Sequence, residues 1–144
     1  MILIFLFLLL SYSKASTIEY KTCSGQYVMD IKSLSAVPWP PRTGLRTAFE
    51  FDTYLFKETP SLYVNVTLQM SVGFKSWETI MIDKFDLCNE SSSCPLQPGQ
   101  HSFGFHYNIP ANAPVGNRWR AVIRFEDKEE NQLSCIELDR FKVN

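Results

Sequence analysis

The feature that most constrains the fold of this chain is an alternation of apolar and other residues from Leu62 to Phe74. Every even-numbered position in this stretch is apolar, and most odd-numbered positions are polar. Successive side chains of a β-strand point to opposite faces of the sheet, so a period of two residues predicts a long strand with one buried face. The same period recurs over residues 103–109 and 119–125, which predicts two more strands of this kind.

Turn-forming residues divide the rest of the chain into further short segments. Pro, Gly, Asn or Asp punctuate residues 38–41, 59–60, 95–99, 110–116 and 127–131. Additional strands are expected at residues 18–22, 28–33, 45–56, 79–85 and 133–143. No segment has a helical period. Seven or eight strands separated by polar turns predict an all-β fold, an antiparallel β-sandwich that forms one domain over residues 16–144.

The first ten residues, Met1 to Leu10, are all apolar. A transmembrane helix needs about twenty apolar residues, so this run is too short to cross a bilayer. It fits the core of a secretory signal peptide, and Ser13-Lys14-Ala15 supplies a cleavage pattern of small residues, although no basic residue precedes the run. We therefore expect a signal peptide over residues 1–15 and a mature protein that is secreted or luminal.

The four cysteines, Cys23, Cys88, Cys94 and Cys135, all follow the expected signal peptide. An even number in an oxidising compartment indicates two disulfides, and four cysteines allow three pairings. Cys88 and Cys94 flank a short polar loop that one bridge can close, which would leave Cys23 for Cys135; the residues alone do not choose this pairing. A zinc site is a weak alternative, because the chain has no Cys-x2-Cys motif.

Charge and motifs argue against several classes of function. A formal net charge of −1 without a basic block disfavours nucleic-acid binding, which depends on neutralising phosphates. Neither Gly-x-Ser-x-Gly nor His-Glu-x-x-His occurs. His101 and His106 are an odd number of residues apart, so on one strand they point to opposite faces and do not share a metal ion. We expect no enzyme, cofactor or metal, and a hairpin turn at the acidic run 126–130.

An immunoglobulin domain is the competing fold, because Cys23, Trp39 and Cys88 have nearly the spacing of its Cys…Trp…Cys pattern. Trp39 is flanked by prolines on both sides, however, and prolines remove hydrogen bonds from a central strand. In addition, Asp86 stands where an immunoglobulin has its corner tyrosine. These departures disfavour a true immunoglobulin domain.

Several short motifs occur in an order that is typical of one family. They are Tyr20-Lys-Thr-Cys23, Asp86-Leu-Cys88, Cys94-Pro-Leu-Gln-Pro-Gly99, Phe103-Gly-Phe105-His-Tyr107, Ile109-Pro110, Ala113-Pro114 and Leu133-Ser-Cys135-Ile136. With the signal peptide they resemble the MD-2-related lipid-recognition (ML) family over nearly all of the mature chain, most specifically over residues 86–136. That family includes Niemann–Pick type C2 sterol carriers, phosphatidylglycerol/phosphatidylinositol transfer proteins and the receptor accessories MD-1 and MD-2.

The resemblance implies an immunoglobulin-like sandwich with a lipid cavity between its sheets. It also implies the disulfides Cys23–Cys135 and Cys88–Cys94, while a third disulfide that many members have is missing near Pro38-Trp-Pro-Pro41. The inner faces then supply the expected cavity residues Phe49, Phe51, Val64, Val66, Leu68, Met70, Phe74, Phe103, Phe105, Tyr107, Trp119 and Ile123. The plain alternative is that these side chains fill a close-packed core.

On this basis we expect a secreted or endolysosomal monomer that holds one sterol or phospholipid and moves it between membranes through transient membrane contact. Two alternatives stay open: a receptor-accessory or innate-immune module with a membrane-protein partner, and a structural sandwich that binds no lipid. The sequons Asn65-Val-Thr67 and Asn89-Glu-Ser91 predict N-glycans at Asn65 and Asn89. The residues do not identify the lipid.

Overall fold

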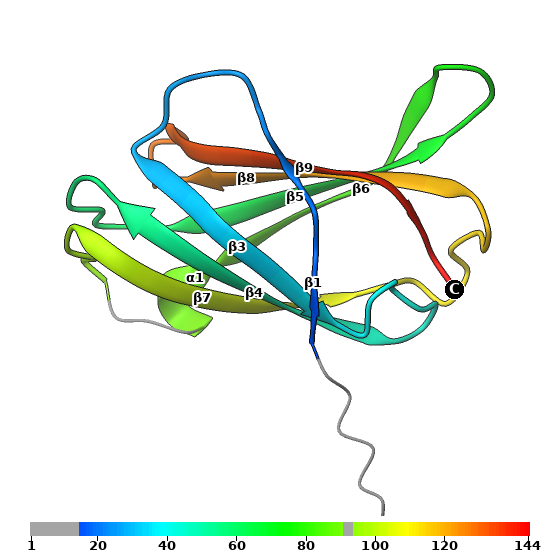
Figure 1. Cartoon of the computed structure of the whole chain (residues 1–144), viewed down its shortest axis with the longest axis horizontal. Coiled ribbons are helices and arrows are strands. Elements are labelled where there is room, and N and C mark those ends of the chain that lie inside the picture. Colours follow the sequence, from blue (N-terminus) through cyan, green and yellow to red (C-terminus); the bar gives the residue numbers. More distant parts are fainter. Residues whose placement is uncertain (1–14, 91–93) are drawn as a thin grey trace, which may run out of the picture.

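Two antiparallel sheets face each other in the computed structural model, which describes residues 15–90 and 94–144 with nine strands among them (Figure 1). The first sheet contains β1 (Ser16–Thr17), β3 (Met29–Val37), β4 (Arg46–Leu55) and β7 (Gly99–Asn108), in that order. The second contains β2 (Lys21–Thr22), β9 (Gln132–Lys142), β8 (Arg118–Glu126), β5 (Tyr63–Ser71) and β6 (Trp77–Asp86), in that order. The predicted all-β sandwich is confirmed, with more strands than the expected seven or eight.

The additional strand comes from the N-terminal segment, where one strand was expected over residues 18–22. Instead, β1 pairs with β3 of the first sheet, whereas β2 pairs with β9 of the second. The residues between them pass from one sheet to the other, so the expectation of a single strand is wrong. The segment thus closes one side of the sandwich.

A single helical turn, α1 (Leu87–Glu90), follows β6 and was not expected from the sequence. Its first turn is capped by Asp86, whose Oδ1 accepts a hydrogen bond of 2.9 Å from the backbone amide of Cys88. An acidic residue before a short turn is the signal that predicts such a cap, but one turn is too short to give a helical period. Within the described residues, no helix has the length and apolar character needed to cross a bilayer.

Stacked aromatic rings fill the space between the sheets. Phe49 and Phe51 of β4 lie opposite Phe105 and Phe103 of β7 in the strand register. The ring centroid of Phe105 is 5.3 Å from that of Phe49 and 5.5 Å from that of Phe51. The ring of Phe125, on β8, lies 5.2 Å from Phe51, so contacts between the two sheets are aromatic as well. These buried rings account for much of the apolar surface that stabilises the fold.

The alternation that predicted β5 is confirmed as far as Leu68 and fails at its end. Val64, Val66 and Leu68 are buried, but β5 ends at Ser71 and the chain turns, with positive φ at Gly73 and Lys75. Phe74 therefore lies on the hairpin tip with 90% of its surface exposed. The expectation that Phe74 lines the interior is wrong, because the strand does not extend to it.

Both disulfides implied by the family resemblance are formed. Cys23 is bonded to Cys135 and Cys88 to Cys94, with Cα–Cα distances of 5.3 and 5.6 Å. The Cys23–Cys88 bond of the immunoglobulin alternative is therefore absent among the described residues. The predicted signal peptide lies outside the described residues except for Ala15, and so does Ser91 of the second sequon.

Candidate functional site

An apolar pocket lies between the two sheets, near the ends of β7 and β9. Its walls are formed by Trp39, Pro41, Phe49, Val66, Leu68, Phe105, Tyr107, Ile109, Ala121, Ile123, Leu138 and Phe141. The pocket has a volume of about 20 Å³, which is space for roughly one water molecule. The lining side chains are apolar except for the Tyr107 hydroxyl and the indole N–H of Trp39, so the pocket favours hydrocarbon over water.

The structure brings half of the predicted cavity residues to this pocket. Phe49, Val66, Leu68, Phe105, Tyr107 and Ile123 line it. Four others, Phe51, Val64, Phe103 and Trp119, are buried in the core without lining it, and Met70 is half-buried. The contact of any of these side chains with a lipid stays a prediction.

The other half of the lining was not among the predicted cavity residues. Ile109 and Ala121 lie on faces that the alternation predicts to be apolar, whereas the remaining four residues were missed for two reasons. Trp39 and Pro41 lie in an irregular proline-rich segment, where no period marks an inner face. In β9 an irregularity in the register pairs Trp119 with Phe141 and Ala121 with Leu138. This irregularity shifts the inward side by one residue, so Phe141 points inward where an unbroken alternation would place residue 140. The positive φ of 57° at Arg140 marks the shift, but no sequence signal announces it.

Three of the lining side chains also form the boundary between the pocket and the outside. Trp39, Leu138 and Phe141 line both the interior pocket and a hollow of about 440 Å³ on the surface. The ring centroids of Trp39 and Phe141 are 5.1 Å apart, and both side chains are half-buried. We call these three residues the aromatic wall, after the two rings that it contains beside Leu138. The pocket is therefore separated from the outer hollow by side chains alone at this point.

The outer hollow is charged, in contrast to the pocket behind the wall. Its remaining lining consists of Ile18, Glu19, Pro40, Asp139, Arg140 and Lys142. Arg140 forms an exposed ion pair with Asp139 at 3.8 Å, and exposed pairs of this kind contribute little to stability. An apolar interior next to a charged exterior suits a molecule with one apolar and one polar end.

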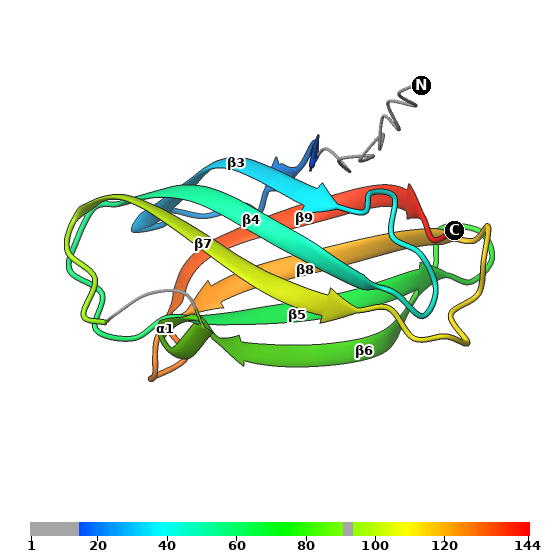
Figure 2. The ribbon, with the colours of Figure 1, turned by 90° about the horizontal axis from the view of Figure 1, so that it is seen from below.

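The opposite side of the sandwich is closed by side chains between two strands that do not pair. β7 is one edge strand of the first sheet and β6 is one edge strand of the second, and the two lie on the same side (Figure 2). The Tyr107 hydroxyl donates a hydrogen bond of 3.1 Å to Sδ of Met81, and Phe85 contacts the rings of Phe105 and Tyr107. Burial raises the pKa of Tyr107, and the nearby carboxylate of Asp83 raises it further, so the hydroxyl remains a donor.

Two buried threonines on the inner face of β4 differ in their hydrogen bonding. The Thr53 hydroxyl donates a hydrogen bond of 2.9 Å to the carbonyl of His101. Thr47, which lies opposite Tyr107 in the register, has a buried hydroxyl without a partner among the described residues. An unpaired buried hydroxyl costs free energy, so this position is a polar defect near the pocket.

The predicted glycosylation sites lie in different surroundings. Asn65 is half-buried in the middle of β5, with Lys84 and Arg124 beside it in the register. Asn89 is exposed on α1, where its Nδ2 donates a hydrogen bond of 3.1 Å to Asp86. Glycans at these positions stay predictions.

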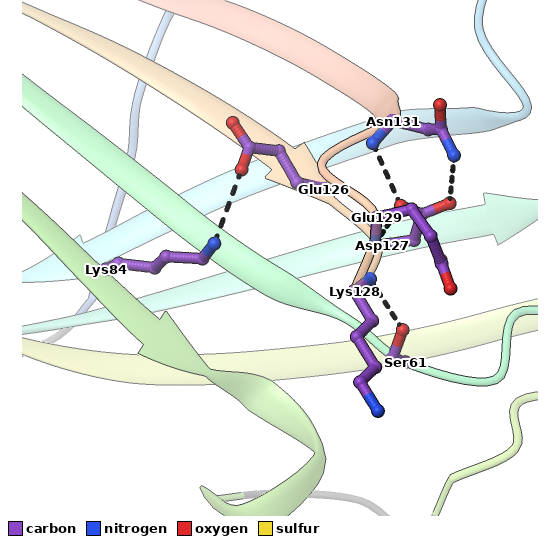
Figure 3. A network of polar contacts seen from close by, with 7 residues as sticks. All are labelled: Ser61, Lys84, Glu126, Asp127, Lys128, Glu129 and Asn131. Carbon is purple, nitrogen blue, oxygen red and sulfur yellow. Dashed lines mark hydrogen bonds and ion pairs between the residues drawn. The ribbon is translucent and has the colours of Figure 1, made fainter.

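The acidic run at residues 126–130 forms the hairpin turn between β8 and β9 (Figure 3). Oδ1 of Asp127 accepts hydrogen bonds from the backbone amides of Glu129 and Asn131, at 3.0 and 2.9 Å. Burial acts to raise the pKa of Asp127, but the hydrogen bonds from Asn131 and Glu129 outweigh it, and the pKa is lowered. The carboxylate of Asp127 therefore stabilises the turn, as expected for a charged hairpin.

Comparison with known proteins decides the family. The family described as ML domain matches residues 17–140. The chain belongs to the ML domain family. This ML-domain protein is 25% identical over 121 residues to a protein named phosphatidylglycerol/phosphatidylinositol transfer protein from Yarrowia lipolytica. The match covers 79% of the chain and 61% of the relative, so the chain spans about three-fifths of that protein's length.

Solved structures share the fold of this ML-domain protein at low sequence identity. A Niemann–Pick type C2 protein from the Japanese carpenter ant has a TM-score of 0.70 at 9% identity, with 88% of this chain and 100% of that chain covered. Chicken MD-1 complexed with lipid IVa has a TM-score of 0.58 at 14% identity, with 90% and 97% covered. These likenesses confirm the β-sandwich fold.

Proposed function

We propose that this ML-domain protein carries a single lipid with its apolar part between the two sheets and its polar head in the outer hollow, and transfers it between membranes. The observation that carries the proposal is the aromatic wall, in which three side chains separate an apolar pocket from a charged hollow. Secretion or residence in the lysosomal lumen fits the disulfides and the expected signal peptide. The name of the yeast relative and the lipid-bound MD-1 structure lend support.

Binding a lipid requires the interior to expand. The pocket of about 20 Å³ is far below the volume of roughly 300–1,000 Å³ that ligand sites of this kind provide. Two boundaries offer the expansion without breaking a sheet, because both consist of side chains: the aromatic wall and the β6–β7 edge. Each 100 Å² of apolar lipid surface that is buried contributes about 2.5 kcal/mol, which is the free energy that offsets the opening.

A phospholipid fits this arrangement better than a sterol. The hollow presents Arg140 and Lys142, and both cations suit a phosphodiester next to the wall. Glu19 and Asp139 in the same hollow can face a positively charged head group. A sterol has only a hydroxyl for this surface and would leave its charged groups unused. We therefore propose a phospholipid as the ligand, with a sterol as the alternative.

The test is native mass spectrometry of the protein from a eukaryotic secretory host, followed by titration of the delipidated protein with a fluorescent phospholipid and a fluorescent sterol. We expect one bound phospholipid per chain. Ala121→Leu, which adds atoms to the pocket wall, should weaken binding, whereas Ala48→Leu on the half-buried outer face of β4 should not. A native protein that carries no lipid and binds neither probe would contradict the proposal and favour the alternative of a structural sandwich that binds no lipid. A stable protein partner together with tight lipid binding would favour the receptor accessory.

A further inference from the structure

Exposed apolar side chains gather at the end of the sandwich that contains the aromatic wall. β4, β6 and β8 begin at this end and β5, β7 and β9 finish there, as the strand register shows. Backbone hydrogen bonds join its loops, from Gly44 to Ile109 at 2.9 Å and from Asn144 to Pro41 at 2.8 Å. Both ribbon views place the β5–β6 hairpin tip and residues 110–117 at the same end as the C-terminus (Figures 1 and 2). We call it the pocket end.

Four large apolar side chains are exposed here. Leu45 is 48% exposed, Val72 39%, Val115 63% and Phe74 90%. Phe74 is at the tip of the hairpin, where the positive φ values of Gly73 and Lys75 hold the turn. Single exposed apolar residues are ordinary, but four on the loops around one end form a surface that favours an apolar partner.

Most of the charged side chains at the same end are basic. Its exposed basic side chains are Arg42, Arg46, Lys75, Arg118, Arg140 and Lys142. Among the described residues, the acidic side chains at this end are Glu19 in the outer hollow, Glu78 and Asp139, and Asp139 is paired with Arg140. The opposite end carries Glu58, Asp86, Asp127, Glu129 and Glu130 beside Lys57 and Lys128. A chain of net charge −1 thus has an excess of basic side chains at the pocket end and of acidic side chains at the opposite end.

We propose that the pocket end docks on the surface of an anionic phospholipid bilayer, with Phe74 inserted at the level of the head groups. Cations beside exposed apolar side chains are complementary to such a surface, because the apolar groups enter the interface while Lys and Arg pair with lipid phosphates. The Lys75 Nζ lies 5.4 Å from the centroid of the Phe74 ring, so one hairpin tip supplies both contacts.

This inference rests on the proposed lipid transfer and specifies where transfer takes place. Trp39 and Phe141 of the aromatic wall lie at the pocket end, with Lys142 in the hollow outside them. Docking this end brings the wall to the bilayer. A lipid can then pass between membrane and pocket without its apolar part entering water.

The chain contains its own matched control. Phe56 and Lys57 form a second exposed Phe-Lys pair, at the end of β4 that is remote from the pocket. Phe56 is 57% exposed and its ring lies 5.1 Å from that of Tyr54. Lys57 adjoins Glu58 and acts electrostatically on Asp127, so this pair has an acidic setting. The two pairs therefore share chemistry and differ in location.

The experiment is flotation of the full mature protein with vesicles of phosphatidylcholine alone and of phosphatidylcholine with 30% phosphatidylglycerol, at low and high salt. We expect binding to the anionic vesicles that weakens with salt. Phe74→Ser should weaken it about tenfold and Lys75→Glu at least about fivefold. Phe56→Ser and Lys57→Glu should leave it unchanged. Equal effects of the two pairs, or a parent protein that does not float, would overturn the docking proposal.

A second measurement separates this proposal from the proposed function. Titration of each delipidated variant with a fluorescent phospholipid in solution reports the pocket without a bilayer, and Phe74→Ser should bind like the parent. Lipid binding without flotation would overturn docking and retain the carrier. Flotation that depends on Phe74, in a protein that binds no lipid in solution, would support docking and overturn the carrier.

Discussion

At the scale of the residue, we predict opposite changes in the free energy of unfolding when the hydroxyl groups of two threonines of β4 are removed. Thr47→Val removes a buried hydroxyl that has no partner and should raise the free energy of unfolding by about 1 kcal/mol. Thr53→Val, on the same inner face, removes the donor to the carbonyl of His101 and should lower it by a similar amount. Urea denaturation of the delipidated proteins measures both values. A loss of stability in Thr47→Val would mean that its hydroxyl has a partner in solution.

Neighbouring residues of β5 provide a second test, because they point to opposite faces. Val66 is 4% exposed and lines the pocket, so Val66→Asp places an unpaired charge in the interior and should prevent secretion of folded protein. Thr67 is half-buried on the other face, and Thr67→Ala should cost little stability while removing a glycan at Asn65. Yield from a secretory host and gel mobility before and after deglycosylation report the outcome. Similar yields of the two variants would contradict the assigned faces.

At the scale of the element, the strands of the β6–β7 edge should be more dynamic than the strands at the centre of the second sheet. β5 and β8 are hydrogen-bonded on both sides, whereas β6 and β7 each have one unpaired edge, and these edges are joined through side chains such as Tyr107 and Met81. Hydrogen exchange followed by mass spectrometry should show faster exchange in β6 and β7 than in β5 and β8. Bound lipid should slow the exchange of β6 and β7. Uniform protection across all four strands would argue against opening at this edge.

Strand-level features were predictable where the period is regular and the neighbours are strands. The inner faces of β5, β7 and β8 follow directly from alternation, as Val64, Phe103 and Ile123 illustrate. Prediction failed where one residue changes the direction of the chain. The turn beyond Ser71 exposes Phe74, and the irregularity in β9 moves Phe141 inward. Both are local changes of the backbone that an alternation of apolar and polar residues does not predict.

Two features belong to the scale of the whole molecule and follow from no residue pattern: the pocket and the uneven distribution of charge between the two ends. The pocket is a residual space between two sheets, and its wall joins Trp39 to Phe141, which are far apart in sequence. The polarity of charge likewise arises only when Lys75, Arg118 and Lys142 come to one end. The motifs led to the fold family, whereas the position of the site depended on the relative placement of the sheets.

The aromatic wall leads to a prediction about the rate of lipid uptake by the whole molecule. If lipid enters past Trp39, then Trp39→Ala should speed the uptake of a fluorescent phospholipid, because the side chain that must move aside is absent. The variant should also lose about 1–3 kcal/mol of stability, since Trp39 is half-buried against Phe49 and Phe141. Stopped-flow mixing with a water-soluble, short-chain fluorescent phospholipid measures the rate without a docking step on a bilayer.

Trp77 is the control for this measurement. It is also half-buried, but it lies on β6 with the guanidinium of Arg120 4.6 Å from its ring, away from the pocket lining. Trp77→Ala should therefore leave the uptake rate unchanged. If lipid instead enters at the β6–β7 edge, Trp39→Ala will not alter the rate and Met81→Ala, which removes the acceptor of the Tyr107 hydroxyl, will raise it. The two variants thus decide which boundary of the sandwich opens.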